Sequence, residues 1–193
     1  MNQNQASSGF ERIKKKIRSI FYNAQILYEV EVGYPKGSAR YPGKSTYGKF
    51  HTPPNVIEVA FWNNYGTKTI PARPFFTTAC SRMQKETTPY LVDTFKNLNI
   101  DSVKERDIRD NLLYNLHRLG AFCVGIVQKE IRDWKIPPNS DITVHGGWVY
   151  NKKAKKSVFV KGKGVNNPLV DTGWLQKCVQ HVVRTKEYVP PTL

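Results

Sequence analysis

The spacing of apolar residues predicts a long amphipathic helix over residues 102–134. Apolar side chains recur there every three or four residues, which places them on one face of a helix. Ser102 and Glu105 have the spacing of a capping box at its start, and Pro137–Pro138 end it. At roughly 1.5 Å per residue, the helix is about 45 Å long. Its apolar stripe consists of Ile108, Leu112, Leu116, Leu119, Cys123, Ile126 or Val127, Ile131 and Trp134.

Three further segments carry helical spacing or helix boundary signals. Residues 10–24 place apolar side chains on one face and basic ones largely opposite, which predicts an amphipathic helix with a basic face. That face is either a solvated surface or a surface for nucleic acid or a partner. A short helix is expected from residue 55 to Gly66, because two prolines precede it and glycine follows. Another helix is expected around residues 75–83, continuing or restarting at Pro89.

Alternating apolar and polar positions predict a β-strand in residues 26–35, where Gly33 and Pro35 end the alternation. Residues 140–167 favour a β-hairpin or flexible arm. Residues 168–186 favour a turn followed by a last helix or strand.

These elements predict an α+β fold, in which a small antiparallel or mixed sheet packs against one long helix plus shorter helices. Strands from the N-terminal half and from the C-terminal segment form the sheet. We expect a single domain over residues 9–186, with extended loop arms at 36–54 and 145–166. Residues 1–8 are expected to be disordered, and residues 187–193 form a C-terminal tail.

Charge is the outstanding feature of the composition. The 193 residues include 30 Lys or Arg and 15 Asp or Glu, so the formal net charge is +15. Such an excess favours contact with nucleic acid or with an acidic protein surface. No apolar run approaches the ~20 residues of a membrane-spanning helix, and the start lacks a signal-peptide layout. We therefore expect a soluble protein, made in a cytoplasm and without membrane contact.

The densest positive charge lies in the second arm, where lysines alternate with Tyr150 and Phe159. One interpretation is contact with phosphate groups, without recognition of base sequence. The other is a solvated loop, or a loop that docks on an acidic neighbouring subunit. The glycines of residues 161–165 lack the features of a phosphate loop and are expected to make the arm flexible. The lysines are Lys152, Lys153, Lys155, Lys156, Lys161 and Lys163.

The triplet Asp171-Thr172-Gly173 has the residues found around the catalytic aspartate of aspartic proteases. That chemistry needs two carboxylates that share a proton, and a later apolar-apolar-glycine segment that braces the loop. About twenty residues follow the triplet, none of which provides this segment, and the bulky Trp174 stands where a small residue is required. The triplet is better explained as a turn, in which Asp171 or Thr172 caps the segment starting at Trp174 and Gly173 permits a tight backbone.

Metal and cofactor chemistry find no support in the sequence. The histidines, His51, His117, His145 and His181, lack the spacing of a metal motif. Three cysteines without a C-x-x-C pair argue against disulfides and zinc, so we expect reduced thiols in or near the core. No catalytic, cofactor-binding or metal site is predicted, and no enzymatic activity.

Three segments, residues 58–76, 126–147 and 168–183, together resemble one family, the neck or tail-completion (phage morphogenesis) proteins of long-tailed bacteriophages. The matching residues are Tyr65-Gly66-Thr67, Ile70-Pro71-Ala72-Arg73-Pro74-Phe75, Pro137-Pro138-Asn139-Ser140 with Thr143, and Pro168-Leu169-Val170-Asp171-Thr172-Gly173-Trp174-Leu175. Two departures stand out, because Asn64 occupies a position where the family usually has Glu, and Val144-His145 one where it commonly has Arg-Lys.

The resemblance implies a structural virion protein, assembled in the host bacterial cytoplasm, that forms a ring at the head-tail junction. Such a ring, hexameric by analogy with the tail tube, completes the tail and joins it to the head. The implied partners are copies of itself, a head-closure or connector ring, a tail terminator or tail tube protein, and genomic DNA passing non-specifically through the channel. The alternatives are a tail-terminator or head-closure ring protein, or a basic nucleic-acid-binding module.

Within this resemblance, we expect structural or interface roles for the motif residues rather than catalytic ones. Arg73, between two prolines, is expected to bond carbonyls or a carboxylate, and Asp171 is its first candidate partner. The full set is Gly66, Arg73, Pro74, Phe75, Asp171, Thr172 and Gly173.

Overall fold

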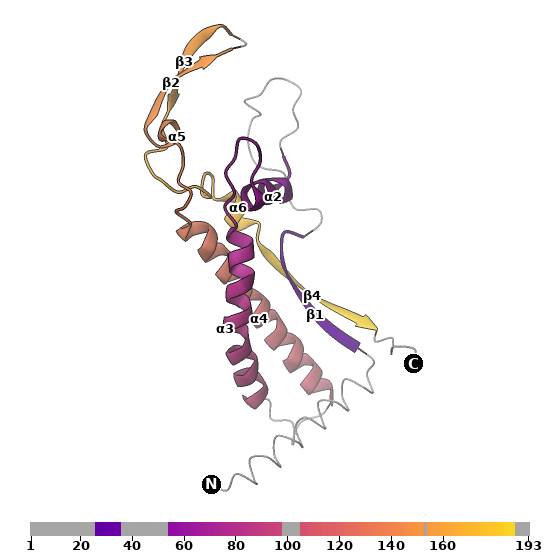
Figure 1. Cartoon of the computed structure of the whole chain (residues 1–193). Coiled ribbons are helices and arrows are strands. Elements are labelled where there is room, and N and C mark those ends of the chain that lie inside the picture. The colour runs from indigo at the N-terminus through magenta and orange to yellow at the C-terminus, as the bar shows by residue number, and fades with distance from the viewer. Residues whose placement is uncertain (1–25, 36–53, 98–104, 153, 188–193) are drawn as a thin grey trace. The chain divides into compact units, whose positions relative to one another are not determined.

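The computed structural model describes residues 26–35, 54–97, 105–152 and 154–187. Several sequence predictions lie outside these residues: the N-terminal tail, the basic helix, most of the first loop arm, the capping-box serine, Lys153 and most of the C-terminal tail. The elements in chain order are β1 (Ile26–Gly33), α2 (Val56–Tyr65), α3 (Phe75–Asn97), α4 (Glu105–Asp133), α5 (Asp141–His145), β2 (Gly146–Asn151), β3 (Lys156–Lys161), α6 (Trp174–Lys177) and β4 (Gln180–Glu187). Helices and small antiparallel sheets together confirm the predicted α+β class (Figure 1).

The chain divides into two compact units, each assembled from separate segments. Unit 1 comprises the described residues of Met1–Gly33, Gln84–Val124 and Gln180–Leu193. Unit 2 comprises those of Tyr34–Met83 and Gly125–Val179. The single-domain boundaries expected from the sequence stay a prediction.

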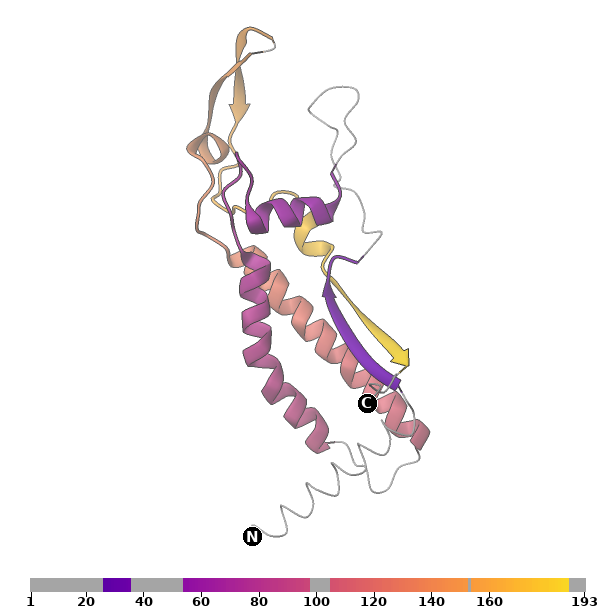
Figure 2. The same cartoon turned by 45° about the vertical axis from the view of Figure 1, so that its right-hand side comes forward.

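In unit 1, a strand from the N-terminal half pairs with a C-terminal strand, as the sequence predicts. β1 and β4 run antiparallel, with Val30 opposite Val183. The pair lies beside α4 in both views (Figures 1 and 2), where His181 packs on Gly120. A Cβ added at position 120 would lie 2.5 Å from Cδ2 of His181, so the glycine is what lets the strand approach the helix.

Aromatic contacts join α3 and α4 within unit 1. The rings of Tyr90 and Phe122 stack with centroids 5.4 Å apart and planes 8° from parallel. The guanidinium of Arg118 lies 5.9 Å from the ring centroids of both Tyr90 and Tyr114, within the range of cation–π attraction. Helix α3 runs through Pro89 as one helix, which answers the question that the sequence left open.

In unit 2, helix α2 begins and ends with signals that the sequence carries. The Oδ1 of Asn55 accepts from the N–H of Ile57 at 3.1 Å, and the Asn55 N–H donates to Oε2 of Glu58 at 2.8 Å. This is a capping box. Gly66, with φ of 79°, ends the helix, and its N–H donates to the carbonyl of Trp62 at 2.8 Å. The short helix predicted up to Gly66 is confirmed.

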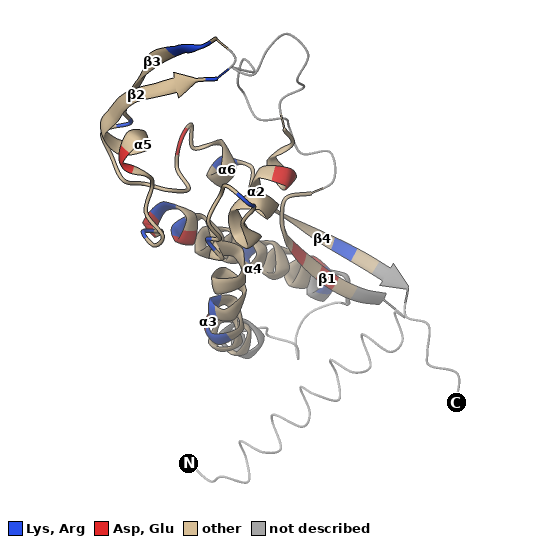
Figure 3. Ribbon diagram, turned by 45° about the horizontal axis from the view of Figure 1, so that its top comes forward, with Lys and Arg blue, Asp and Glu red and all other residues tan. Residues whose placement is uncertain are grey.

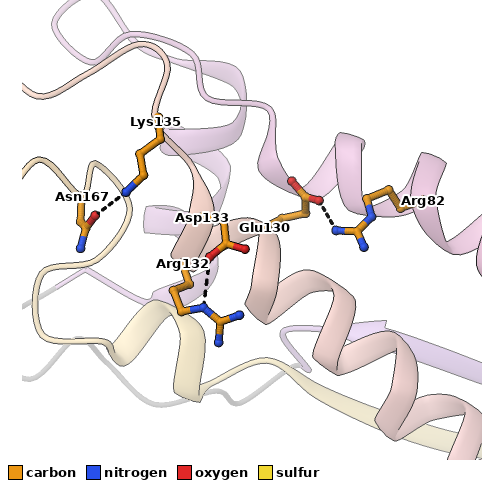
Figure 4. A network of polar contacts seen from close by, with 6 residues as sticks. All are labelled: Arg82, Glu130, Arg132, Asp133, Lys135 and Asn167. Carbon is orange, nitrogen blue, oxygen red and sulfur yellow. Dashed lines mark hydrogen bonds and ion pairs between the residues drawn. The ribbon is translucent and has the colours of Figure 1, made fainter.

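The buried side chains of unit 2 come from α2, the start of α3, the end of α4 and the segment around α6. Complete burial of a large apolar side chain such as Phe75 or Ile131 stabilises the fold by about 1.5–3 kcal/mol. An ion pair between Arg82 and Glu130, 2.6 Å long, links α3 to α4 beside this core (Figure 4). The buried apolar residues are Val56, Ala60, Phe75, Ala79, Ile126, Val127, Ile131, Leu169, Leu175 and Val179.

The arm predicted at residues 145–166 contains a β-hairpin formed by β2 and β3, with α5 packed at its base. Trp148 lies opposite Phe159, and Val149 lies opposite Val158. Directly opposite residues share a face of the hairpin, so one face is aromatic and the other aliphatic. From Trp148 to the tip, and along the whole of β3, the described residues are exposed on both faces.

Candidate functional site

Arg73 is a buried cation in unit 2, with 6% of its surface exposed. Its backbone N–H donates to the carbonyl of Asn63 at 2.7 Å, which fixes the loop between α2 and α3. Its Nε donates to the carbonyl of Pro137 at 3.1 Å, and its Nη2 donates to that of Pro138 at 3.2 Å. Burial lowers the pKa of Arg73, because the charged form loses hydration. The rigid guanidinium fork thus holds two successive carbonyls that have no backbone partner in a helix or strand.

The pairing of Arg73 with Asp171 that the sequence suggested is wrong. Asp171 is exposed and has no hydrogen bond or ion pair among the described residues. The Nε and Nη2 of Arg73 donate to the carbonyls of Pro137 and Pro138 instead. Carbonyls were the other class of partner expected for this guanidinium.

A second set of hydrogen bonds connects the region around Pro137 and Pro138 to Asn166 and Asn167, which directly precede the third motif. The backbone N–H of Asn139 donates to Oδ1 of Asn166 at 3.0 Å. The ammonium of Lys135 donates to Oδ1 of Asn167 at 3.0 Å (Figure 4). Direct contacts therefore join the first two motifs and the residues that immediately precede the third, and we call these residues the motif frame: Arg73, Lys135, Pro137, Pro138, Asn139, Asn166 and Asn167.

Lys163 belongs with this frame and not with the cationic surface to which the sequence assigned it. Its ammonium donates to the carbonyl of Asn167 at 3.0 Å and also to the carbonyl of Val170. These bonds hold the turn that precedes the Asp171 triplet. A partly buried ammonium with two carbonyl partners contributes to the fold, so we remove Lys163 from the set of candidate phosphate contacts.

The Asp171-Thr172-Gly173 triplet forms a turn, as expected, but Asp171 takes no part in capping it. The hydroxyl of Thr172 accepts from the N–H of Trp174 at 3.3 Å. Gly173 has φ of 73° and ψ of 3°, the left-handed conformation that glycine adopts most readily. Leu175, at the start of the following short helix, is 2% exposed, so the turn delivers an apolar anchor to the core.

Asn64 is a structural residue that sequence reasoning missed. It is 5% exposed, and its Oδ1 accepts from the N–H groups of Phe76 at 3.0 Å and Thr77 at 3.4 Å. Its Nδ2 donates to the Thr77 hydroxyl at 3.2 Å. Asn64 thus caps the first turn of α3 from the end of α2. The signal was present as the departure from Glu at this position, but its partner twelve residues away became visible only in the fold.

Pro74 and Phe75 begin α3 directly after Arg73. The carbonyl of Pro74 accepts from the N–H of Thr78 at 2.9 Å, so proline stands at the helix start, where its missing N–H costs nothing. Phe75 is completely buried. Both positions have the structural role that the sequence indicated.

A shallow apolar groove lies on α2, and the sequence did not single it out. Ile57, Phe61 and Tyr65 follow one another at four-residue spacing and are exposed, although the adjacent Val56, Ala60 and Asn64 are buried. The rings of Phe61 and Tyr65 lie 4.8 Å apart between centroids. The hollow beside them encloses about 190 Å³. We define the α2 groove by its lining residues, which are Tyr34, Ile57, Ala60, Phe61, Asn64, Tyr65, Phe75 and Phe76.

The lysines near the hairpin tip are exposed, as a phosphate-contacting or partner-contacting surface requires. The tip turns through Asn151, whose Oδ1 accepts from the N–H of Ala154 at 3.1 Å, and through Lys155, which has φ of 50°. Figure 3 shows basic residues on the hairpin close to its tip. We define the cationic tip as Lys152, Lys155 and Lys156, and add to it Lys161, which lies opposite Gly146 at the base of the same hairpin; all four are exposed.

The described part of the chain contains no group of three or more His, Cys, Asp or Glu side chains that could hold a metal ion. The Nδ1 of His117 and the Nε2 of His181 lie 3.2 Å apart. Among the described residues, no third His, Cys, Asp or Glu joins them to form a possible metal site. Burial raises the pKa of the Cys123 thiol, which keeps it protonated. The thiols are free, but Cys80 is exposed, contrary to the expected place in or near the core.

Comparison of this chain with family models, with curated proteins and with solved structures gives no match. Within the described ranges, no helix is both long enough and apolar enough to cross a membrane.

Proposed function

We propose that this protein is a structural subunit of a ring-shaped assembly. The observation that supports this is the motif frame, in which the motif residues and their neighbours bond to backbone carbonyls, to a backbone amide and to each other. Exposed apolar surfaces on α2 and on both faces of the hairpin are the features that a subunit covers when it assembles. A ring needs such surfaces at two different places on each subunit.

More particularly, we propose a neck or tail-completion protein of a long-tailed bacteriophage, located in the virion at the head-tail junction. The resemblance carries this step. The direct contacts between its first two motifs, and between the second motif and the residues just before the third, support it, because separate motifs of one family are expected to meet in the fold. In this proposal the ring is a hexamer, and it joins a head-closure or connector ring to a tail terminator or tail tube protein.

The positive charge fits a subunit that borders a DNA channel. With a net charge of +15 and an exposed cationic tip, the protein can contact phosphate groups without base recognition. The same positive charge would also bind an acidic neighbouring ring. The charge therefore supports contact with DNA in the channel less specifically than the motifs support a place at the neck.

Localisation in the intact virion tests the proposal most directly. We expect electron microscopy of virions that carry a tagged chain to show a ring of density between head and tail. Deletion of the gene is expected to leave filled heads and separate tails that do not join. Density at the far end of the tail, or normal joining without the protein, would contradict the neck assignment.

The exposed cationic tip favours a second candidate, a basic nucleic-acid-binding module. A module of this kind should bind DNA as the isolated protein, with an affinity that falls steeply as salt increases. A neck subunit need not bind DNA before assembly. Tight, salt-sensitive binding by the isolated chain, together with its absence from virions, would favour the second candidate.

A further inference from the structure

The α2 groove has the size and lining of a site for an aromatic ring. A closed cavity of about 150 Å³ lined by apolar side chains is known to accept benzene, and the α2 groove, which is open to solvent, has a volume of about 190 Å³. Its wall is aromatic on both sides, since Phe61 and Tyr65 face it from α2 and Phe75 and Phe76 from α3. A planar apolar side chain therefore suits it better than a polar ligand.

The hairpin supplies exposed aromatic rings of this kind. Trp148, Tyr150 and Phe159 are 70%, 60% and 56% exposed, and the first and last pack edge to face with centroids 5.6 Å apart. A two-stranded hairpin with both faces in water is marginally stable. Its aromatic face is thus prepared for contact, and α5 at its base leaves that face uncovered.

We propose that the aromatic face of the hairpin in one copy of this chain docks in the α2 groove of the next copy. Trp148 and Phe159 are the anchors, and Phe61 and Tyr65 receive them. The contact joins two different surfaces, so repetition around an axis closes a ring. This inference rests on the proposed ring function and identifies the contact between its subunits.

The exposed area is sufficient for such a contact. Since a whole aromatic side chain contributes about 200 Å², the exposed parts of Trp148, Tyr150, Phe159, Phe61 and Tyr65 amount to roughly 600 Å². Interfaces are about 57% apolar, so this corresponds to an interface of about 1,000 Å², near the lower limit for specific association. A second copy is the occupant that accounts for both surfaces at once, because every chain carries one of each.

Charge distinguishes a second copy from an acidic partner or nucleic acid. Each copy carries a net charge of +15, so association of copies brings like charges together. Added salt screens this repulsion and should strengthen the self-association. The same salt weakens attachment of a basic chain to DNA or to an acidic protein.

Two variants, each lacking one surface, test the proposal by complementation. Phe61→Asp removes the groove, and Phe159→Asp removes the hairpin anchor. By analytical ultracentrifugation we expect the wild-type chain to form species larger than dimers, more so at higher salt, and each variant alone to be monomeric. An equimolar mixture should give dimers and nothing larger, because only one intact groove and one intact hairpin can meet.

The matched control is Tyr114→Asp, since Tyr114 is an aromatic residue in unit 1 with a similar exposure of 62%. It should associate like the wild type. Circular dichroism and thermal unfolding establish that the variants fold. If either variant does not fold, a cysteine cross-link replaces the complementation test. Trp148→Cys and Tyr65→Cys are made as two separate chains, each with Cys80 and Cys178 replaced by serine. When the two chains are mixed and oxidised, they should form a disulfide-linked dimer.

A monomeric wild-type chain, higher oligomers formed by either variant alone, or a mixture that stays monomeric would overturn this inference. Localisation of the tagged chain at the neck would then still support the proposed function. If the mixture gives dimers but virions carry no neck density, the proposed function fails and the subunit contact stands.

Discussion

At the scale of single residues, the most consequential side chain is Arg73, whose buried charge serves backbone carbonyls. Arg73→Ala leaves the carbonyls of Pro137 and Pro138 without donors, and hydrogen bonds from a charged group contribute about 1.5–3 kcal/mol each. We therefore expect the free energy of unfolding to fall by about 3 kcal/mol, and by less for Arg73→Lys, which keeps the charge but not the planar fork. Urea titration followed by fluorescence measures both.

The control for Arg73 is Arg132→Ala. Arg132 is exposed and pairs with its neighbour Asp133 at 3.1 Å on the surface of α4 (Figure 4). Exposed pairs contribute little, so a change within ~0.5 kcal/mol is expected. Equal losses for the two arginines would show that the two carbonyl bonds of Arg73 are unimportant.

In the Asp171-Thr172-Gly173 triplet, we expect substitutions to change stability through the backbone conformation of the turn and not through loss of the Asp171 carboxylate. Asp171→Asn is expected to change the free energy of unfolding by less than ~0.5 kcal/mol, because the carboxylate is exposed and without a partner among the described residues. Gly173→Ala should cost about 1 kcal/mol, because its φ of 73° strains any residue with a Cβ. Urea midpoints of the two variants provide the comparison, and a larger loss for Asp171→Asn would contradict it.

At the scale of elements, α3 depends on a cap supplied by another helix. Asn64→Leu should remove the acceptor for two N–H groups in the first turn of α3, at a cost of about 2 kcal/mol. Asn63→Ala, which loses one bond from Nδ2 to the carbonyl of Val59, should cost less. Hydrogen exchange of the amides of Phe76 and Thr77 reports on the cap itself. Unchanged protection of these amides in Asn64→Leu would mean that they have other acceptors.

Gly120 and Gly125, both in α4, provide a matched test of the close contact between β4 and this helix. Gly120→Ala places a Cβ 2.5 Å from the ring and 2.9 Å from the Cβ of His181, so the strand must shift, which costs about 1–3 kcal/mol. Gly125→Ala meets nothing within 4 Å and should gain up to about 1 kcal/mol, because alanine favours helix. Thermal unfolding of the two variants should therefore move in opposite directions, and a parallel shift would contradict the Gly120 contact.

At the scale of the whole molecule, the positive charge of the exposed hairpin lysines can be removed to test whether it contributes to DNA binding. Replacing the four lysines of the cationic tip by glutamine lowers the net charge from +15 to +11 (15 − 4). If each lysine contacts a phosphate, the slope of log affinity for duplex DNA against log salt should become shallower by about 3–4, since each contact contributes about 0.9. Fluorescence anisotropy over a salt series measures the slope.

Lys163→Gln is the matched control for this charge, because it also removes one lysine of the arm. Its ammonium is engaged with the carbonyls of Asn167 and Val170, so the salt slope should stay the same and the stability should fall. A four-lysine variant with an unchanged slope would show that DNA contact, where it occurs, lies elsewhere on the chain.

Much of the local structure could be predicted, because its causes are local. The bounds of α2 follow from Asn55, Glu58 and Gly66, which act on their own helix. The apolar stripe of α4 is buried at Leu112, Cys123, Ile126, Val127 and Ile131, as its spacing predicts. Alternation predicted β1, and the pairing of a strand from the N-terminal half with the C-terminal segment is confirmed, although the sequence left open whether that last segment is a helix or a strand.

The candidate site was predicted less well, because its contacts connect residues far apart in sequence. Motif order suggested that Arg73 and Asp171 matter, and charge density suggested the lysines, but a guanidinium can bond carbonyls as readily as carboxylates. Only the fold shows that Arg73 meets residues 64 and 65 positions later. Lys163 was misassigned for the same reason, since composition does not tell an engaged ammonium from a free one.

The sequence by itself determined the class of fold, the main helices and the turn at Gly173, and it offered the hairpin as one of two alternatives, because periodicity and backbone preference act over a few residues. The tertiary structure alone decided which motifs meet, that Asn64 caps α3, and that an apolar groove and an uncovered hairpin face occur on the same chain. These outcomes depend on burial and on long-range hydrogen bonds, which are properties of the packed chain and cannot be obtained from any segment alone.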